Sequence, residues 1–222
     1  MGNYKVIEEF NSINGEGRRA GEPAHFIRFA GCNLDCSYCD TRYANGENAR
    51  YQIMSEEELY LHVKDSFIEN VTLTGGEPLL QENIGRLLKL FNRDGRLNIE
   101  VETNGSVDIS PFLDEADRIS FTLDYKLPGS GMEGYMLTKN YDYIREQDTV
   151  KFVAGSIDDL KRAKEIIEEY SLCDKCRVYI SPVFGKIDPA DIVKFLLENE
   201  MGKVRVQLQL HKFIWDPNER GV

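Results

Sequence analysis

The sequence predicts an α/β fold with a parallel sheet, and two observations support this prediction. Apolar segments of about five residues alternate along the chain with longer stretches of helical period. Most of the helical stretches begin with residues that cap helix N-termini, which indicates where each helix starts. Strands that alternate with helices form right-handed βαβ units, and successive units place their strands in parallel.

Short, largely apolar segments account for the predicted strands. Seven are expected, at 25–30, 71–74, 97–103, 119–124, 150–154, 178–181 and 203–210. A loop rich in glycine and proline is expected at 126–134. We find no internal repeat and no linker, so 1–222 is predicted to form one domain.

Helices are predicted between these strands. The helix at 55–66 begins with a capping box of Ser55 and Glu58, and the helix at 81–92 places two leucines and Phe91 on one face. Capping residues open three more, at Ser110-Pro111, at Ser156 with Asp159 (to 170) and at Asp188-Pro189 (to 198).

The composition limits the classes of function. The 222 residues carry a formal net charge of −11, which argues against nucleic-acid binding, because neutralising phosphates requires a basic surface. A small-molecule substrate fits better. Five cysteines, three of them clustered, suit a reducing cytoplasm rather than a disulfide scaffold. No stretch approaches the ~20 apolar residues that span a bilayer, so a cytoplasmic protein without membrane contact is expected.

The clustered cysteines are the most informative feature. Cys32, Cys36 and Cys39 are spaced four and three residues apart. Three thiolates cannot all pair as disulfides, but they can converge on one iron–sulfur cluster, whose cubane form has four irons. Three ligands leave one iron open, and an open metal position is typical of sites that perform chemistry. A zinc or structural-thiol loop is the alternative, but zinc motifs usually bring paired Cys-x-x-Cys or histidine partners nearby.

Other unusual loops follow the predicted strands. They are the cysteine loop after the first strand, then 75–78 (Gly-Gly-Glu-Pro), Asn104-Gly105, 124–126 (Asp-Tyr-Lys) and 182–185. In parallel α/β architectures, ligands bind at the carboxyl ends of the strands. All five loops are therefore expected to open onto one face.

Two polar features precede the cysteine loop. Two glycines flank Glu16, so this turn either approaches a ligand closely or is a surface turn with a solvated glutamate. Arg28 lies inside a predicted buried strand, and buried arginine is rare unless paired. It is expected either to form a salt bridge or to bind an anionic ligand.

The Cys-x-x-x-Cys-x-x-Cys spacing, with an aromatic residue before the last cysteine, resembles the signature loop of the radical S-adenosylmethionine enzymes. Residues 74–78 (Thr-Gly-Gly-Glu-Pro) resemble the second motif of that superfamily. The resemblance implies a partial (β/α) barrel with helices outside. It also implies a 4Fe–4S cluster whose open iron is chelated by S-adenosylmethionine.

Further segments narrow the resemblance: 12–17, 26–28, 39–41, 124–128 and 209–212. Together they look like the 7-carboxy-7-deazaguanine synthases of queuosine biosynthesis, a tRNA modification pathway. This resemblance implies a lyase that contracts the ring of 6-carboxy-5,6,7,8-tetrahydropterin to 7-carboxy-7-deazaguanine, with loss of ammonia. Mg²⁺, a single-electron donor such as a flavodoxin or ferredoxin, and a homodimer are implied as well.

The same resemblance assigns site residues. It implies cluster ligation by Cys32, Cys36 and Cys39, and magnesium binding by Thr41. It implies S-adenosylmethionine binding by Tyr38, Cys39, Asp40, Gly76, Asp124, Tyr125 and Lys126. It implies substrate binding by Ile13, Asn14, Gly15, Glu16, Arg28, Thr74 and His211.

The residues themselves suit these roles. A 2-amino-pyrimidinone edge matches Glu16 or Asn14, the guanidinium of Arg28 suits a carboxylate, and magnesium prefers oxygen donors such as the Thr41 hydroxyl. That hydroxyl could equally cap the following helix. The sequence departs from the family at two points. Asn14 stands where the family usually has glutamine. Family members can also place their C-terminal carboxylate near the substrate, whereas here the chain continues to Val222.

Two other functions are considered. An activase that forms a glycyl radical on a partner protein would need a protein-sized opening and would not use Arg28 or Glu16 as small-molecule ligands. A plain iron–sulfur electron carrier would need a fourth ligand, and none lies near the loop. Cys173 and Cys176 have no second pair nearby, so they do not predict a zinc site.

Overall fold

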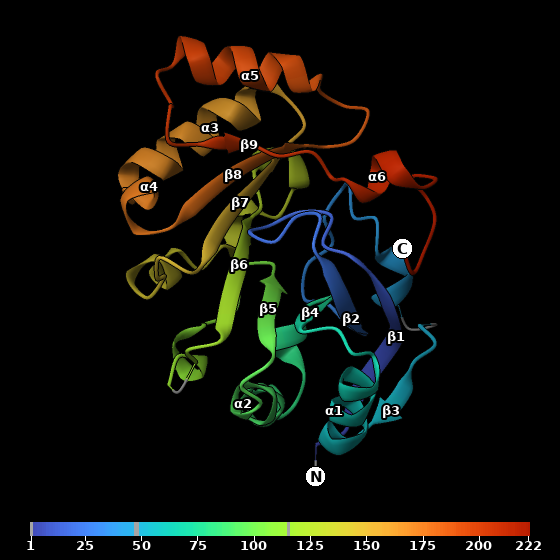
Figure 1. Ribbon diagram of the computed structural model, residues 1–222. Helices are drawn as coiled ribbons and strands as arrows, with labels where there is room; N and C mark the ends of the chain where they lie inside the picture. The colour runs from blue at the N-terminus through green and yellow to red at the C-terminus, as the bar shows by residue number, and fades with distance from the viewer. Residues whose placement is uncertain (1, 47–48, 115) are drawn as a thin grey trace.

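The computed structural model describes residues 2–46, 49–114 and 116–222. A curved nine-stranded sheet runs in the order β3-β1-β2-β4-β5-β6-β7-β8-β9, and helices cover its outer side (Figure 1). The strands are β1 (Tyr4–Ile13), β2 (Pro23–Phe29), β3 (Gln52–Met54), β4 (Asn70–Gly75), β5 (Asn98–Thr103), β6 (Ile119–Tyr125), β7 (Thr149–Ala154), β8 (Arg177–Pro182) and β9 (Arg205–Val206). Pairing is parallel from β2 to β9, whereas β1 pairs antiparallel with both β2 and β3.

The α-helices are α1 (Glu56–Asp65), α2 (Ile84–Arg93), α3 (Ile157–Glu169), α4 (Leu172–Lys175), α5 (Pro189–Glu198) and α6 (His211–Ile214). Short 3₁₀ helices lie at Arg42–Ala44, Pro78–Leu80, Ser110–Phe112, Pro128–Ser130, Glu133–Tyr135 and Thr138–Asp142. The capping box of Ser55 and Glu58 is present, and Leu87, Leu88 and Phe91 are buried, as predicted. No helix within the described residues is long and apolar enough to cross a membrane.

The sequence located the first six predicted strands and most of the long helices, but two predictions were wrong. The segment 203–210 forms only the two-residue strand β9. Gln207 N still donates to Ile180 O of β8 (3.0 Å), but the Gln207 side chain and Leu210 N bond to the N-terminal turn, and the strand does not continue. Ser110 opens only a 3₁₀ turn without a side-chain cap, and it is the Asp108 carboxylate that accepts a hydrogen bond from Ser110 N (2.8 Å). Strands β1 and β3 were not predicted.

The turn after β1 bonds to the segment that follows β9, the last strand of the sheet. Gln207 pairs with this turn through its side-chain amide, which accepts from Gly17 N (2.8 Å) and donates to Gly17 O (2.9 Å). Leu210 N donates to Gly15 O (3.0 Å). In Figure 1 the turn, drawn in blue, lies within the curve of the sheet, below β9. The architecture is therefore a partial barrel, as the family resemblance implied.

The interior of this barrel is polar. Thr72, Glu100, Thr122 and Lys151 are all buried, and they come from four successive strands, β4 to β7. The alternate positions of the same strands carry apolar side chains such as Phe121 that belong to the hydrophobic core. Because apolar packing is satisfied on one side, the opposite side of the sheet is available to hold a polar ligand.

Candidate functional site: the carboxyl ends of the barrel strands

The cysteine loop leaves the end of β2 and is fixed at both of its ends. Gly31 takes a positive φ of 90°, which favours glycine, and its carbonyl accepts from Glu77 N (2.8 Å) in the loop after β4. Ser37 bonds to the loop after β6, with N to Ser130 O (3.0 Å) and Oγ to Gly129 O (2.7 Å). The loops after β2, β4 and β6 therefore meet, as the sequence predicted.

The three cysteines of the loop are free thiols with different surroundings. Cys32 Sγ accepts hydrogen bonds from Leu34 N (3.4 Å) and from Asn104 Nδ2 (3.5 Å). Burial raises the pKa of both the Cys36 and the Cys39 thiol. Charge on Cys39 and Cys32 also raises the pKa of Cys36, although less than burial does.

This arrangement fits a cluster better than a single zinc ion. Within the described residues, no three His, Cys, Asp or Glu side chains are placed to bind one metal ion. Thiolates around one zinc each lie at about 2.3 Å from it and hence close together, whereas thiolates on different irons of a cubane lie farther apart. The three cysteines of this loop, which are not gathered around a single ion, are the donor set that a 4Fe–4S cluster requires.

The loop after β4 approaches the cysteine loop so closely that only glycine fits. A Cβ on Gly76 would lie 2.0 Å from Gly31 O and 2.5 Å from Asn45 Oδ1. The Asn45 oxygen is buried and has no hydrogen-bond partner among the described residues. Glu77 is completely buried, and burial raises its pKa to about 7 although it accepts three hydrogen bonds. Gly76 therefore presents bare backbone beside the cysteine loop.

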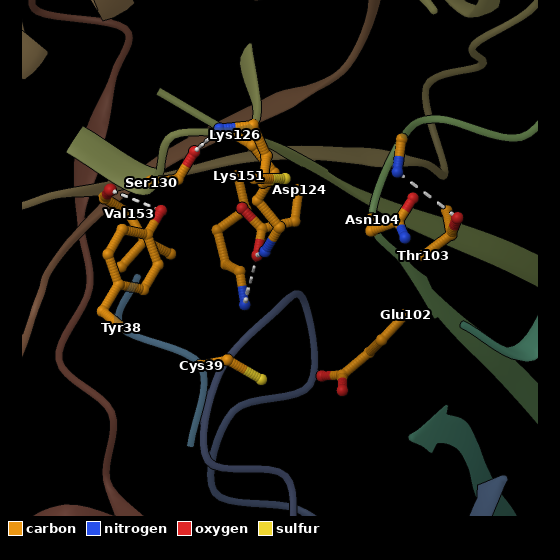
Figure 2. A network of polar contacts seen from close by, with 12 residues as sticks. Tyr38, Cys39, Glu102, Thr103, Asn104, Asp124, Lys126, Ser130, Lys151 and Val153 are labelled. Carbon is orange, nitrogen blue, oxygen red and sulfur yellow. Dashed lines mark hydrogen bonds and ion pairs between the residues drawn. The ribbon is translucent and has the colours of Figure 1, made fainter. Parts of the chain in front are cut away.

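A cluster of charges lies at the end of β6 (Figure 2). Lys126 Nζ is 2.6 Å from Asp124 Oδ2, and Lys151 Nζ on β7 is 3.9 Å from the same oxygen. Burial alone would lower the pKa of both lysines, but the neighbouring carboxylates outweigh it and raise both. Tyr125 faces away from the interior, since its hydroxyl bonds to Glu133 (2.8 Å), so only its backbone is available to a ligand at the rim.

Tyr38 and Asp40 flank Cys39 in the cysteine loop. The Tyr38 hydroxyl donates to Val153 O (3.4 Å), and burial raises the pKa of Tyr38 (Figure 2). The Thr41 hydroxyl donates to Asp40 Oδ1 (2.9 Å) and makes no helix-capping bond, so the capping alternative is wrong. Lys212 approaches the other Asp40 oxygen (3.5 Å).

The turn that follows β1 enters the barrel. Glu16 is buried and accepts hydrogen bonds from Lys151 (3.2 Å), Ser181 (2.9 Å) and Gln209 (2.9 Å), so the alternative of a solvated surface glutamate is wrong. Burial would raise the pKa of Glu16, but Lys151 and these hydrogen bonds outweigh it and lower the pKa. Asn14 Oδ1 accepts from Thr72 (2.7 Å), and its Nδ2 is buried without a partner among the described residues.

Three further predicted residues lie around this turn. Arg28 Nε donates to Glu8 (2.7 Å), so the salt-bridge alternative for Arg28 is present. Thr74 Oγ1 donates to Glu102 Oε2 (2.7 Å). His211 packs directly on Gly15, where a Cβ would lie 2.2 Å from its Nδ1, and burial lowers the pKa of His211. The structure thus brings the predicted residues together at one end of the barrel.

Sequence reasoning missed several residues of this site, notably Lys151, Glu102 and Asn45, whereas Asn104 was expected at this face but was given no role. Lys151 and Glu102 lie inside segments that were treated simply as buried strands. A charged residue in such a segment was the available signal, and it was used only for Arg28.

Comparisons with known proteins agree with this geometry. Residues 26–125 match the Radical SAM superfamily. A curated relative from Clostridium acetobutylicum named 7-carboxy-7-deazaguanine synthase is 52% identical over 220 residues, which cover 99% of this chain and 100% of the relative. The chain belongs to the 7-carboxy-7-deazaguanine synthase family. A synthase of the same name from Methanospirillum hungatei is 37% identical, with 96% of this chain and 86% of that protein covered.

The fold of the family is also recognisable in a solved structure. The crystal structure of QueE from Escherichia coli has a TM-score of 0.73 at 21% identity, with 93% of each chain covered. Membership of the 7-carboxy-7-deazaguanine synthase family brings with it the 4Fe–4S cluster and S-adenosylmethionine of radical SAM enzymes. It also excludes the glycyl-radical activase and the plain electron carrier as functions.

Proposed function

We propose that this chain converts 6-carboxy-5,6,7,8-tetrahydropterin to 7-carboxy-7-deazaguanine, with ring contraction and loss of ammonia. The observation that carries the proposal is the match to a synthase of that name along the full length of both chains. The polar barrel interior, with free cysteines at its rim, supports it.

Cys32, Cys36 and Cys39 would hold the cluster, and the Gly76 backbone, Asp124 and Lys126 would contact S-adenosylmethionine. When bound, the cluster and S-adenosylmethionine supply a one-electron cleavage whose radical product abstracts hydrogen from the substrate. Tyr38 and Asp40 adjoin Cys39, and the backbone of Tyr125 adjoins Asp124. The protein orients both ligands and shields them from water.

The N-terminal turn would bind the pterin ring. The unpaired Asn14 Nδ2 is a buried donor that a ring acceptor would satisfy, and an unsatisfied buried donor costs about 1–3 kcal/mol. Glu16 accepts three hydrogen bonds and a carboxylate can accept about four, which leaves room for a ring N–H. The backbone of Ile13 and Gly15 lies on either side of Asn14.

The remaining substrate contacts would come from the surrounding elements. Arg28 uses Nε for Glu8, so its terminal nitrogens can bind the substrate carboxylate. Thr74 and His211 complete the proposed pocket from β4 and from the start of α6.

Magnesium would bind at Thr41. Its hydroxyl lies beside the Asp40 carboxylate, and both are oxygen donors of the kind that magnesium prefers. Two such donors leave most of the coordination shell to water and to the substrate carboxylate. Omitting magnesium should therefore raise the KM for the pterin more than it lowers kcat.

A low-potential one-electron donor, such as a flavodoxin or ferredoxin, would reduce the cluster, and the active form is proposed to be a homodimer. Light scattering on the anaerobic protein tests the dimer, because it gives the mass directly. A mass equal to that of one chain would refute it.

Product analysis tests the function. Anaerobically reconstituted protein is mixed with dithionite, S-adenosylmethionine and the tetrahydropterin, and the products are identified by mass spectrometry. The expected result is 7-carboxy-7-deazaguanine, with the C32A variant as an inactive control. Formation of 5′-deoxyadenosine without any deazaguanine would refute the proposed substrate.

A further inference from the structure

Asn104, at the end of β5, joins the first cluster ligand to the rest of the barrel. Its side-chain Nδ2 lies 3.5 Å from Cys32 Sγ and 3.0 Å from Asn33 Oδ1. Asn104 is 7% exposed, so water does not compete freely for these contacts. Figure 2 shows Asn104 at the edge of the polar interior, next to Thr103.

The orientation of the Asn104 amide follows from its neighbours. Ser106 N, which can only donate, lies 3.0 Å from Asn104 Oδ1, and the Ser106 hydroxyl lies 2.6 Å from the same atom. The atom facing Ser106 must therefore be the oxygen. The atom facing Cys32 is then the nitrogen, which donates an N–H to the sulfur.

The backbone of Asn104 is held equally firmly. Asn104 N donates to Glu77 Oε2 (2.6 Å), and the other Glu77 oxygen accepts from Leu79 N (3.0 Å) and Thr103 Oγ1 (2.9 Å). Glu77 directly follows Gly76 in the chain. The loop proposed to bind S-adenosylmethionine thus fixes the residue that donates to the cluster ligand.

We infer that Asn104 is a positioning residue that raises the reduction potential of the cluster by donating a hydrogen bond to the Cys32 thiolate. The inference rests on the proposed cluster site. Reduction adds one negative charge to the cluster, and an N–H dipole aimed at a ligand sulfur stabilises the more negative state. A second asparagine, Asn45, approaches Cys39 Sγ at 3.9 Å. This contact is longer, so its effect is smaller.

The test is a redox titration of the reconstituted protein without S-adenosylmethionine, followed by electron paramagnetic resonance of the reduced cluster. Asn104→Ala should shift the midpoint potential to a more negative value, and Asn45→Ala should shift it less in the same direction. Ser106→Ala is the matched control. It removes the hydroxyl hydrogen bond to the Asn104 oxygen and the bond that this hydroxyl accepts from Asn33 (2.8 Å), but no donor to sulfur, so the potential should stay at the parent value.

A measurement on protein with Asn104 intact guards against a variant that fails to assemble. In Asn45→Ala protein labelled with nitrogen-15 only in the asparagine side-chain amide, the reduced cluster should show a weak nitrogen coupling in pulsed resonance. Absence of that coupling would overturn the inference. An unchanged potential in Asn104→Ala, or loss of its iron and sulfide, would do so too, because the residue would then be inert or merely structural.

These outcomes are separable from failure of the proposed function. A parent protein that binds no cluster, or makes no deazaguanine, contradicts the proposed function. A parent protein that does both, with the same potential in Asn104→Ala, contradicts only the inference about Asn104.

Discussion

Replacing Lys151 by methionine should destabilise the protein strongly. The Lys151 side chain is 10% exposed, and its ammonium lies 3.2 Å from Glu16 Oε2 and 3.9 Å from Asp124 Oδ2. Asp124 keeps Lys126 at 2.6 Å, so the variant mainly leaves Glu16 uncompensated, with only the neutral donors Ser181 and Gln209. Removing one partner of a buried ion pair costs about 3–5 kcal/mol. Because two donors remain, we expect about 3 kcal/mol, a large part of a typical stability of about 5–15 kcal/mol.

Urea denaturation followed by circular dichroism measures this loss under anaerobic conditions. The matched control is Lys161→Met, which removes a surface pair with Asp158 (2.9 Å, side chains 63% and 89% exposed) and should cost less than about 1 kcal/mol. The double variant Lys151→Met with Glu16→Gln should recover most of the stability, because no buried charge is left unpaired. A loss below about 1 kcal/mol in Lys151→Met would refute the reasoning.

The pH dependence of the same variants gives the sign of the effect. In the parent, the folded pKa of Glu16 lies below its ordinary value of 4.5, so its contribution to stability is present above pH 4.5 and is lost as the pH falls through the folded pKa. Without Lys151, burial raises that pKa. The deficit of Lys151→Met relative to the parent should therefore shrink as the pH is lowered from 7 towards 5.

Three further substitutions test other parts of the site. Gly76→Ala places a Cβ 2.0 Å from Gly31 O, so it should lower the free energy of unfolding, measured by urea denaturation, by about 1–3 kcal/mol. It should also weaken S-adenosylmethionine binding in equilibrium dialysis, and an unchanged affinity would contradict the proposed contact. Burial and the adjacent Glu102 raise the pKa of Glu100 to about 7, so the parent protein loses stability as the pH rises from about 4.5 to 7. Glu100→Gln removes this loss and should therefore stabilise the protein at pH 8 by no more than about 3 kcal/mol. Identical pH profiles of stability in the parent and the variant would contradict this. Arg28→Ala should raise the KM for the pterin roughly 10- to 100-fold, since a hydrogen bond to a charged group contributes about 1.5–3 kcal/mol. The cluster spectrum should stay intact, and loss of the cluster would instead show that Arg28 has a structural role.

The central fold could be predicted because its signals are local. Caps such as Ser55 with Glu58 mark a helix start within four residues, and apolar segments mark the buried strands between the helices. Strand β1 was missed because it carries the charged residues Lys5, Glu8 and Glu9 and so does not form an apolar segment. An antiparallel strand near the edge of the sheet can expose such residues to solvent. The length of β9 was overestimated because the chain after β9 bonds to the N-terminal turn: the Gln207 side chain accepts from Gly17 N, 190 residues away in the chain.

In the candidate site, too, the features encoded by neighbouring residues could be predicted and the long-range contacts could not. The cysteine loop and the residues around Gly76 could be predicted, because short spacings encode them. The pairing of Glu16 with Lys151 could not, because the two residues are 135 positions apart and only the closed barrel brings them together. A charge inside a buried strand signals that a partner exists, but it does not say which residue the partner is.

The N-terminal turn connects the closure of the barrel to its chemistry. Its Glu16 carboxylate accepts hydrogen bonds from Lys151 on β7, from Ser181 on β8 and from Gln209 after β9. Three separate parts of the chain therefore hold the turn through Glu16. The adjacent Asn14 keeps a buried donor without a partner among the described residues. The carboxylate that closes the barrel and the amide proposed to bind the pterin therefore belong to one rigid turn. A substrate bound at Asn14 would strengthen that closure, because binding to the folded state alone stabilises it.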